Sequence, residues 1–327
     1  MNKLMPLQKR NISSSRLVFG CMSLGRGGWD GSALANEEIA RAEQAVEAAL
    51  SIGITMFDHA DIYGRGKAEA LFGEVLKRRP DLRDRIVIQT KCGIRFPEGD
   101  LPNRYDFSKS HILRSVDGSL KRLGTDYIDV LLLHRPDPLV EPEEVAEAFE
   151  SLKQSGKVRH FGVSNMNAAQ IRLLQAFLPD PLVVNQLEMS LLRIDWLDEG
   201  VHVNQKKGTE VHFGEGTIEH CRLEQIQLQA WGPLARGMFS GRPLENPPEN
   251  VLKTKELVQR MAAEKHTSEE AIVLGWLMRH PAMIQPVIGT SDPERIRRCE
   301  DAVRQADTMT RDEWYSLYVA SRGSLLP

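Results

Sequence analysis

Short apolar runs alternate with amphipathic segments of helical periodicity through most of the chain, and this alternation constrains the fold most strongly. A strand buried on both faces of a parallel sheet has such a continuous apolar character, and each parallel crossover needs a helix-sized connection. The runs that predict strands are 17–20, 56–58, 87–91, 129–133, 160–164, 183–186, 226–230 and 285–288. The segments that predict helices are 39–51, 68–77, 108–123, 143–155, 168–176, 217–224 and 294–305, with Ser108 as a candidate cap.

Strand–helix units repeated in series along one chain indicate an α/β fold, here a (β/α)8 TIM barrel. An open doubly wound sheet has the same local pattern and is the alternative. A chain of 327 residues has room for two domains. Because α/β barrels of this length commonly form one domain, we expect a single domain over residues 1–327.

Several segments depart from the plain repeat. Residues 4–16 are expected to form an N-terminal hairpin that closes the bottom of the barrel. Residues 196–216 are polar and contain glycine, and residues 231–253 are rich in Gly, Pro and Asn, so both are expected to be long loops at the barrel mouth. Two amphipathic segments, 252–266 and 268–279, precede the last strand.

Composition excludes several classes of protein. A formal net charge of −3 argues against a nucleic-acid partner, which needs a concentrated basic surface. No run of roughly 18 apolar residues predicts a membrane span, and residues 1–15 lack the apolar core of a secretory signal. The chain is therefore expected to be a soluble, cytoplasmic protein without membrane partners. The cysteines fit that reduced compartment because they lie far apart: Cys21, Cys92, Cys221 and Cys299.

Polar residues follow the predicted strands where each one ends. Asp58 ends the second strand, Lys91 the third, and His134 follows the fourth. In a parallel barrel these ends meet at one face, where barrel active sites are built. Asp58 and Lys91 come from neighbouring strands, so we expect them to pair, since a buried charge is costly alone. The less favoured alternative is a purely structural ion pair with no chemistry.

Tyr63 lies in the loop that leaves the second strand and can reach the same face. A nearby Lys91 ammonium is expected to lower the pKa of the Tyr63 phenol from its free value of about 10. Tyr63 would then be a candidate general acid, with His134 as a further donor to a carbonyl oxygen. Taken singly, Tyr63 and His134 are as well explained by packing at the rim.

Motifs for other chemistries are absent from the sequence. There is no GxGxxG dinucleotide fingerprint, P-loop, HExxH or GxSxG, and no cysteine spacing typical of zinc. We therefore expect no metal, and a nicotinamide cofactor would have to bind by another route. Backbone N–H groups at Ser291 together with Arg295 are candidates for holding a phosphate.

At this point the residues resemble a known family. The chain looks like an aldo-keto reductase through FDHADIYG (57–64), TKCG (90–93), LLLHRPDP (131–138), GKVRHFGVSN (156–165), NQLE (185–188), AWGPLARG (230–237) and IGTSDPERI (288–296). Together with MTRDEW (309–314), HRPDP and DHADIYG look most like the bacterial YdhF-type oxidoreductases.

The resemblance implies a catalytic tetrad of Asp58, Tyr63, Lys91 and His134, with Tyr63 as the proton donor. It also implies an NADP(H) site, in which an aromatic residue stacks on the nicotinamide and one loop covers the pyrophosphate. The cofactor-binding residues would be Ser164, Asn165, Gln186, Trp231, Gly232, Pro233, Leu234, Arg236, Gly237, Gly289, Thr290, Ser291 and Arg295. Many relatives have Tyr-Ser where this chain has Trp231-Gly232, and a lysine where it has Thr290. Arg295 still supplies a positive charge that can bind a 2′-phosphate.

The hypothesis that follows is an NADPH-dependent reductase of small aldehydes or ketones. The alternatives are a cofactor-binding regulatory or scaffold subunit on the same barrel, and an aldolase or isomerase that uses Lys91 as a Schiff base. Met22 and Trp29 are candidate substrate-binding residues in the loop after the first strand. A small-molecule carbonyl substrate and a monomer or weak homo-oligomer are expected.

Overall fold

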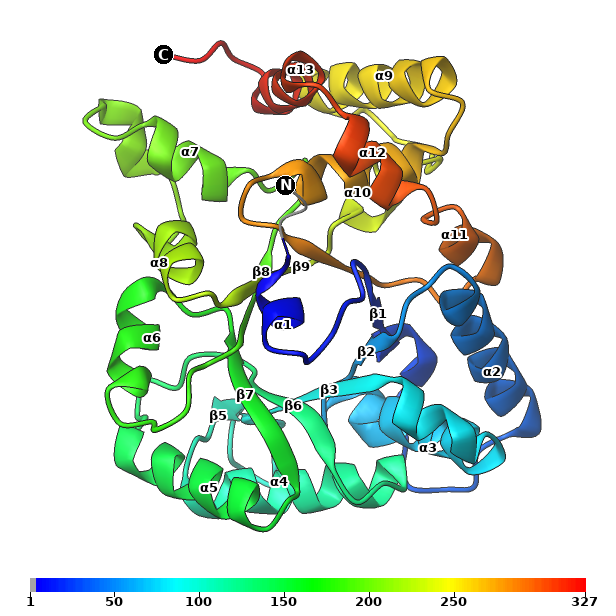
Figure 1. Cartoon of the computed structure of the whole chain (residues 1–327), viewed down its shortest axis with the longest axis vertical. Coiled ribbons are helices and arrows are strands. Elements are labelled where there is room, and N and C mark those ends of the chain that lie inside the picture. Colours follow the sequence, from blue (N-terminus) through cyan, green and yellow to red (C-terminus); the bar gives the residue numbers. More distant parts are fainter. Residues whose placement is uncertain (1–3) are drawn as a thin grey trace.

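A computed structural model of the chain, which describes residues 4–327, contains a closed barrel of parallel strands ringed by helices (Figure 1). The strand order around the barrel is β1-β10-β9-β8-β7-β6-β3-β2, so strands that follow one another along the chain are neighbours. The strands are β1 (Val18–Gly20), β2 (Met56–Asp58), β3 (Val87–Cys92), β6 (Ile128–Leu133), β7 (Val158–Ser164), β8 (Val184–Glu188), β9 (Gln227–Trp231) and β10 (Gln285–Ile288). The predicted barrel is confirmed, and the open-sheet alternative is wrong.

Helices surround this barrel and bury one apolar face each against the strands. Ser108 caps α4 as expected, because its hydroxyl accepts a hydrogen bond from the His111 N–H. The ring consists of α2 (Asn36–Ser51), α3 (Lys67–Arg78), α4 (Lys109–Leu123), α5 (Pro142–Gln154), α6 (Ala168–Gln175), α8 (Thr217–Leu223) and α10 (Glu269–Arg279). Outside it, α9 (Glu249–Glu264) packs against α13 (Arg311–Arg322).

The expected hairpin over residues 4–16 is wrong, because these residues contain the short helix α1 (Pro6–Lys9). Pro6 occupies the first helical turn, where its fixed φ favours a helix and its missing N–H costs nothing. Leu7 is fully buried in one apolar cluster with barrel residues such as Met56 and Val130. The helix thus closes the barrel, and Figure 1 shows α1 across its centre.

The two expected long loops are more ordered than the sequence indicated. Residues 196–216 include most of α7 (Asp195–Val201) and the 3-10 turn η4 (Lys206–Glu210), and residues 231–253 include η5 (Ala235–Gly237) and the start of α9.

The helix expected over 294–305 is two helices, α11 (Pro293–Arg297) and α12 (Ala302–Thr308). Further unpredicted elements are η1 (Cys21–Gly25), η2 (Tyr63–Gly66), η3 (Pro80–Arg85) and the antiparallel pair β4 (Ile94–Arg95) and β5 (Arg104–Tyr105). Within residues 4–327, no helix is both long and apolar enough to span a bilayer.

Candidate active site

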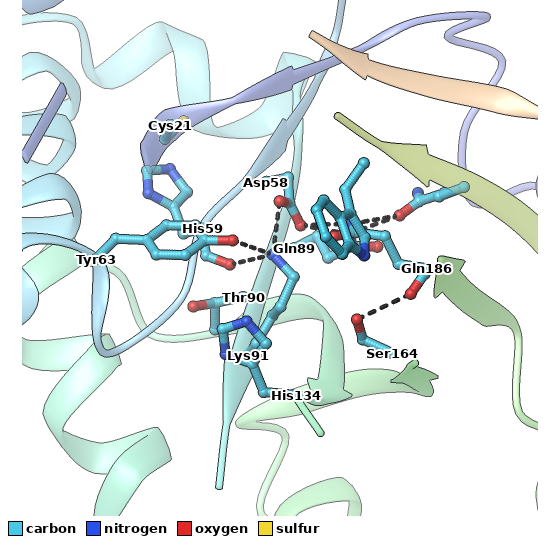
Figure 2. Close-up of polar contacts among 12 residues, drawn as sticks. Cys21, Asp58, His59, Tyr63, Gln89, Thr90, Lys91, His134, Ser164 and Gln186 are labelled. Carbon is cyan, nitrogen blue, oxygen red and sulfur yellow. Dashed lines mark hydrogen bonds and ion pairs between the residues drawn. The ribbon is translucent and has the colours of Figure 1, made fainter. Parts of the chain in front are cut away.

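Asp58 and Lys91 form a buried ion pair at one end of the barrel interior. Asp58 ends β2 and Lys91 lies on the neighbouring strand β3, and their side chains are almost fully buried. The Lys91 Nζ atom lies 2.6 Å from Asp58 Oδ2, 3.0 Å from the His59 carbonyl oxygen and 3.0 Å from the Tyr63 hydroxyl (Figure 2). These contacts hold the Lys91 ammonium in a fixed position. The pairing of Asp58 with Lys91 agrees with the expectation from the sequence.

Tyr63 reaches Lys91 because the chain after β2 continues along β3 before it turns. The His59 N–H donates to the Gln89 carbonyl, and the Asp61 N–H donates to the Lys91 carbonyl. The turn itself needs glycine at position 64, where φ is +59° and a Cβ would lie 2.1 Å from the Gly25 carbonyl oxygen. The close approach of η1 to η2 therefore sets the position of Tyr63.

His134 completes the group at the mouth. The backbone N–H of His134 donates to the Cys92 carbonyl. The imidazole ring meets the Tyr63 ring edge to face, with ring centroids 5.9 Å apart. Burial, reinforced by the charges of Lys91 and Arg135, lowers the pKa of His134 to about 2. His134 is therefore a neutral imidazole, which offers one N–H donor.

The net shift of the Tyr63 pKa is opposite to the expected one. Burial raises the pKa of Tyr63 and outweighs the Lys91 ammonium, which lowers it as expected. Burial also disfavours the charged form of Lys91, but the contacts with Asp58 and Tyr63 outweigh burial and raise the pKa of Lys91. At neutral pH the site therefore holds a phenol beside an ammonium, an arrangement that can donate a proton.

A layer of buried glutamines inside the barrel supports Asp58. The Gln89 and Gln186 side-chain amides each donate to Asp58 Oδ1, at 2.6 and 3.1 Å, and to Gln229 Oε1, at 2.8 and 2.9 Å. Gln229 in turn donates to Gln285, whose amide donates to the Ser15 carbonyl. Gln89 was not among the residues predicted from the sequence, although Gln89 and Lys91 share one face of β3 by the two-residue period of a strand.

A second buried contact joins the strand of Lys91 to the helix after Tyr63. Glu69 on α3 is fully buried and accepts hydrogen bonds from the Thr90 hydroxyl at 2.6 Å and the Arg122 Nε at 2.8 Å. Glu69 was not predicted from the sequence either, because a glutamate early in a helix is typical of an exposed face.

The residues expected at the nicotinamide lie together beside the tetrad. Asn165 donates to the His134 carbonyl at 3.2 Å and to the Ser164 hydroxyl at 2.8 Å. Its Oδ1 accepts from the half-buried Trp231 indole N–H at 3.0 Å. Ser164 donates to the Gln186 carbonyl, which ties β7 to β8 (Figure 2). These four residues thus form one hydrogen-bonded group.

The two outer segments expected to bind the cofactor also meet each other. Gly232 and Gly237 have positive φ, and the Arg295 Nη2 lies 3.0 Å from the point where a Cβ on Gly237 would sit. The loop between these glycines contains Pro233, Leu234 and Arg236, and the segment facing it contains Gly289, Thr290 and Ser291.

Backbone N–H groups that follow Ser291 are already hydrogen-bonded within the protein. The Asp292 carboxylate accepts from the N–H groups of Glu294 and Arg295, so these donors are already satisfied. The Arg295 side chain, which forms no hydrogen bond or ion pair within residues 4–327, remains available for a phosphate.

The candidate substrate residues lie in and after η1. Met22 on η1 is 61% exposed, and Trp29 is half-buried with its indole N–H on the Ser32 carbonyl. Because η1 contacts η2, Met22 belongs to the segment that packs against the turn of Tyr63. Residues 4–327 contain no cluster of His, Cys, Asp and Glu suited to a metal ion.

Comparison with known proteins agrees with this geometry. Residues 16–317 match the Aldo/keto reductase family. The chain is 39% identical to a 6-dehydroglucose reductase of Agrobacterium fabrum, covering 95% of this chain and 96% of that protein. It is 38% identical to the oxidoreductase YdhF of Escherichia coli, covering 86% and 88%. Among solved structures, the holo form of the aldo-keto reductase AKR11C1 from Bacillus halodurans is 27% identical, with a TM-score of 0.71 and coverage of 93% and 91%.

A family match over most of the chain and relatives above 30% identity agree with the barrel and with the polar group at its mouth. The family reduces carbonyl groups with a nicotinamide cofactor. This chain therefore belongs to the aldo/keto reductase family and is an oxidoreductase that reduces carbonyl compounds.

Proposed function

We propose that the protein is an NADPH-dependent reductase of small aldehydes or ketones in which Tyr63 is the general acid. One observation carries the proposal: the Tyr63 hydroxyl lies 3.0 Å from the Lys91 ammonium, which Asp58 holds from the other side. A phenol in that position can donate its proton to a carbonyl oxygen while the ammonium stabilises the phenolate left behind.

The roles of the four residues follow from their contacts. Tyr63 supplies the proton, and Lys91 and Asp58 fix the charge beside it. Neutral His134 directs an N–H at the carbonyl oxygen, and its edge-to-face contact with Tyr63 aims both donors at one region. When bound, the reduced nicotinamide supplies the hydride to the carbonyl carbon, so the product is an alcohol and Tyr63 is reprotonated from solvent.

The residues beside the tetrad fit a nicotinamide. Asn165 and Gln186 already donate their amide protons within the protein. The Gln186 side-chain oxygen accepts no hydrogen bond within residues 4–327, and the Asn165 oxygen, which accepts from the Trp231 indole, keeps a second lone pair, so both can accept from a carboxamide NH2. Trp231 offers a flat, half-buried ring. At Gly232, no atom of the described chain other than its sequence neighbours lies within 4 Å of the point where a Cβ would sit, which leaves room for close approach to the backbone.

NADPH is proposed over NADH because of Arg295. Its guanidinium is exposed, has no ion-pair partner within residues 4–327, and lies against the glycine loop. A 2′-phosphate offers the oxygen fork that a free guanidinium binds best.

No observation favours the two alternative functions. Lys91 stays protonated beside Asp58, which makes it a poor nucleophile for a Schiff base. A scaffold subunit would not need the complete proton-donating arrangement that this chain retains. Two relatives, from Agrobacterium fabrum and Novosphingobium aromaticivorans, are named 6-dehydroglucose reductases, so 6-dehydroglucose is the first substrate to assay.

Titration of the purified protein with NADPH and with NADH, followed by tryptophan fluorescence, tests the cofactor. A carbonyl screen that includes 6-dehydroglucose then tests the reaction. Tight NADPH binding, weaker NADH binding and consumption of NADPH with an aldehyde are expected. A folded protein that binds neither nucleotide would refute the proposal.

A further inference from the structure

Arg135, the residue after His134, is a half-buried cation without a counter-ion among residues 4–327. Within the described chain its guanidinium forms no hydrogen bond and no ion pair. Two other partly buried arginines are neutralised: Arg83 pairs with Asp129, and Arg122 pairs with Glu69. Arg16 is partly buried too and, like Arg135, has no ion pair within residues 4–327. Removing a cation from water is costly unless a partner replaces the water, so Arg135 requires an explanation.

The acidic groups that could pair with Arg135 are already used. Asp137, two residues further on, turns its carboxylate to backbone N–H groups of Phe107 and Leu139, both at 2.9 Å. Asp58, the carboxylate of the tetrad, is bonded to Lys91 and to two glutamine amides. The part of the chain that the structure describes thus leaves the charge of Arg135 available to a bound ligand.

The position of Arg135 points to the substrate as that partner. Its guanidinium carbon lies 5.8 Å from the centre of the Trp231 ring, and its charge acts directly on His134. Asn165 links these two neighbours, because it bonds both the Trp231 indole and the His134 carbonyl. Arg135 therefore lies beside the proposed nicotinamide platform and the proposed carbonyl-orienting histidine at once.

We propose that Arg135 reads an oxygen-bearing substituent, a carboxylate or a hydroxyl, next to the carbonyl that the enzyme reduces. A guanidinium has five N–H donors and no acceptor, so it discriminates in favour of ligands with acceptor oxygens and binds carboxylates with two of these donors. This inference rests on the proposed function and refines it: the preferred substrates are oxygenated aldehydes, not plain aliphatic ones.

The test compares three four-carbon aldehydes: butanal, erythrose with hydroxyls, and succinic semialdehyde with a carboxylate. The wild type is expected to prefer the two oxygenated substrates. In Arg135→Met the kcat/KM ratio of the preferred oxygenated substrate to butanal should fall about tenfold or more, the loss expected for a hydrogen bond to a charged group. Whether erythrose or succinic semialdehyde loses more distinguishes a hydroxyl from a carboxylate partner.

Arg311→Met is the matched control, because Arg311 also lies over an aromatic ring, 5.1 Å from that of Tyr315, but on helix α13. It should leave the ratio at the wild-type value. An unchanged ratio in Arg135→Met, or an equal loss on all three aldehydes, would overturn the proposal.

A binding measurement separates this inference from the proposed function. Succinate and erythritol, which cannot be reduced, are titrated into the wild type and Arg135→Met, with and without NADP+, and followed by tryptophan fluorescence. Binding of at least one of them that is lost in Arg135→Met supports the role of Arg135 even if no aldehyde turns over. A wild type that turns over aldehydes but binds neither probe differently from Arg135→Met refutes the inference alone.

Discussion

The two ends of the proposed cofactor site, the tetrad inside the barrel and Arg295 at its rim, differ in how their polar side chains are hydrogen-bonded in the absence of a ligand. At the inner end, Asp58, Lys91, Gln89 and Gln186 bond one another inside the barrel. At the outer end, Arg295 is exposed and, within residues 4–327, its side chain has no hydrogen-bond or ion-pair partner. At the inner end the charge of Lys91 must stay fixed during the reaction, and the protein itself supplies its partner, Asp58. At the outer end the proposed ligand carries a phosphate, and the Arg295 guanidinium is left available to bind it.

The largest expected effect is at the inner end, on the proton donor. Tyr63→Phe removes the hydroxyl and keeps the ring against His134, so kcat should fall about 10³-fold, within the range for loss of a general acid, while NADPH affinity stays unchanged. Steady-state kinetics and a fluorescence titration measure the two quantities. Tyr105→Phe, at an exposed tyrosine on β5, is the matched control and should keep full activity. Substantial turnover by Tyr63→Phe would show that another group donates the proton.

Breaking the inner ion pair should also cost stability, unlike any change at the outer end. Lys91→Met leaves the Asp58 carboxylate buried without its counter-charge, so the free energy of unfolding should fall by about 3–5 kcal/mol. The double variant Asp58→Leu/Lys91→Met should regain most of that stability but remain inactive. Urea unfolding measures both variants. If the double variant is no more stable than the single one, the pair is not the source of the loss.

The pH profile tests which influence on Tyr63 is larger. Because burial raises the pKa of Tyr63 despite the Lys91 ammonium, the phenol should stay protonated up to pH values above its free pKa of about 10. A general acid works only while protonated, so kcat/KM should be flat from neutral pH to about 10 and fall as pH rises further. Circular dichroism at each pH controls for unfolding. A decline that begins well below pH 10 would mean that the ammonium outweighs burial.

A smaller effect is expected from the glutamine layer. Gln89→Met removes an amide that donates to Asp58, and Gln285→Met removes an amide of the same layer that does not. Each should lower the free energy of unfolding by about 1–3 kcal/mol, the cost of disturbing buried hydrogen bonds. Only Gln89→Met should also lower kcat, with NADPH affinity unchanged. We expect kcat to fall about tenfold, which corresponds to a rise of about 1.4 kcal/mol in the activation free energy. Equal kcat values in the two variants would reduce Gln89 to a packing role.

The comparison between the two ends also explains what could be predicted from the sequence. Asp58, Lys91 and His134 were predictable because each lies at the end of an apolar run, and a parallel barrel brings such ends to one face. The direction of the Tyr63 pKa shift was not, because burial depends on η1 packing against η2 and not on any local pattern. The role of Gln89 needed the register between β2 and β3, which sets the Asp58 contact.

Segments outside the repeat were predicted less well for similar reasons. Helix α1 is too short to show a period, and it is held in place by Leu7 in the barrel cluster. The break between α11 and α12 falls at residues 298–301, within a polar and charged sequence without proline or glycine. At that break the Ser268 hydroxyl donates to the Arg298 carbonyl and the Thr267 hydroxyl donates to the Asp301 carboxylate, contacts with a distant part of the chain that no local pattern shows.

The smallest effect is expected at the outer end, where a substitution should change cofactor binding and leave stability unchanged. Arg295→Ala removes a guanidinium that has no hydrogen-bond or ion-pair partner within residues 4–327, so it should leave stability and kcat at saturating NADPH unchanged. The dissociation constant of NADPH should rise about tenfold, since a hydrogen bond to a charged group contributes about 1.5–3 kcal/mol, while that of NADH should not change. Arg297→Ala is the matched control, because Arg297 lies on the same helix and pairs with Glu294 at 3.5 Å. Equal weakening of NADPH and NADH in Arg295→Ala would mean that the residue shapes the loop rather than binding the 2′-phosphate, and the outer end would then resemble the inner one.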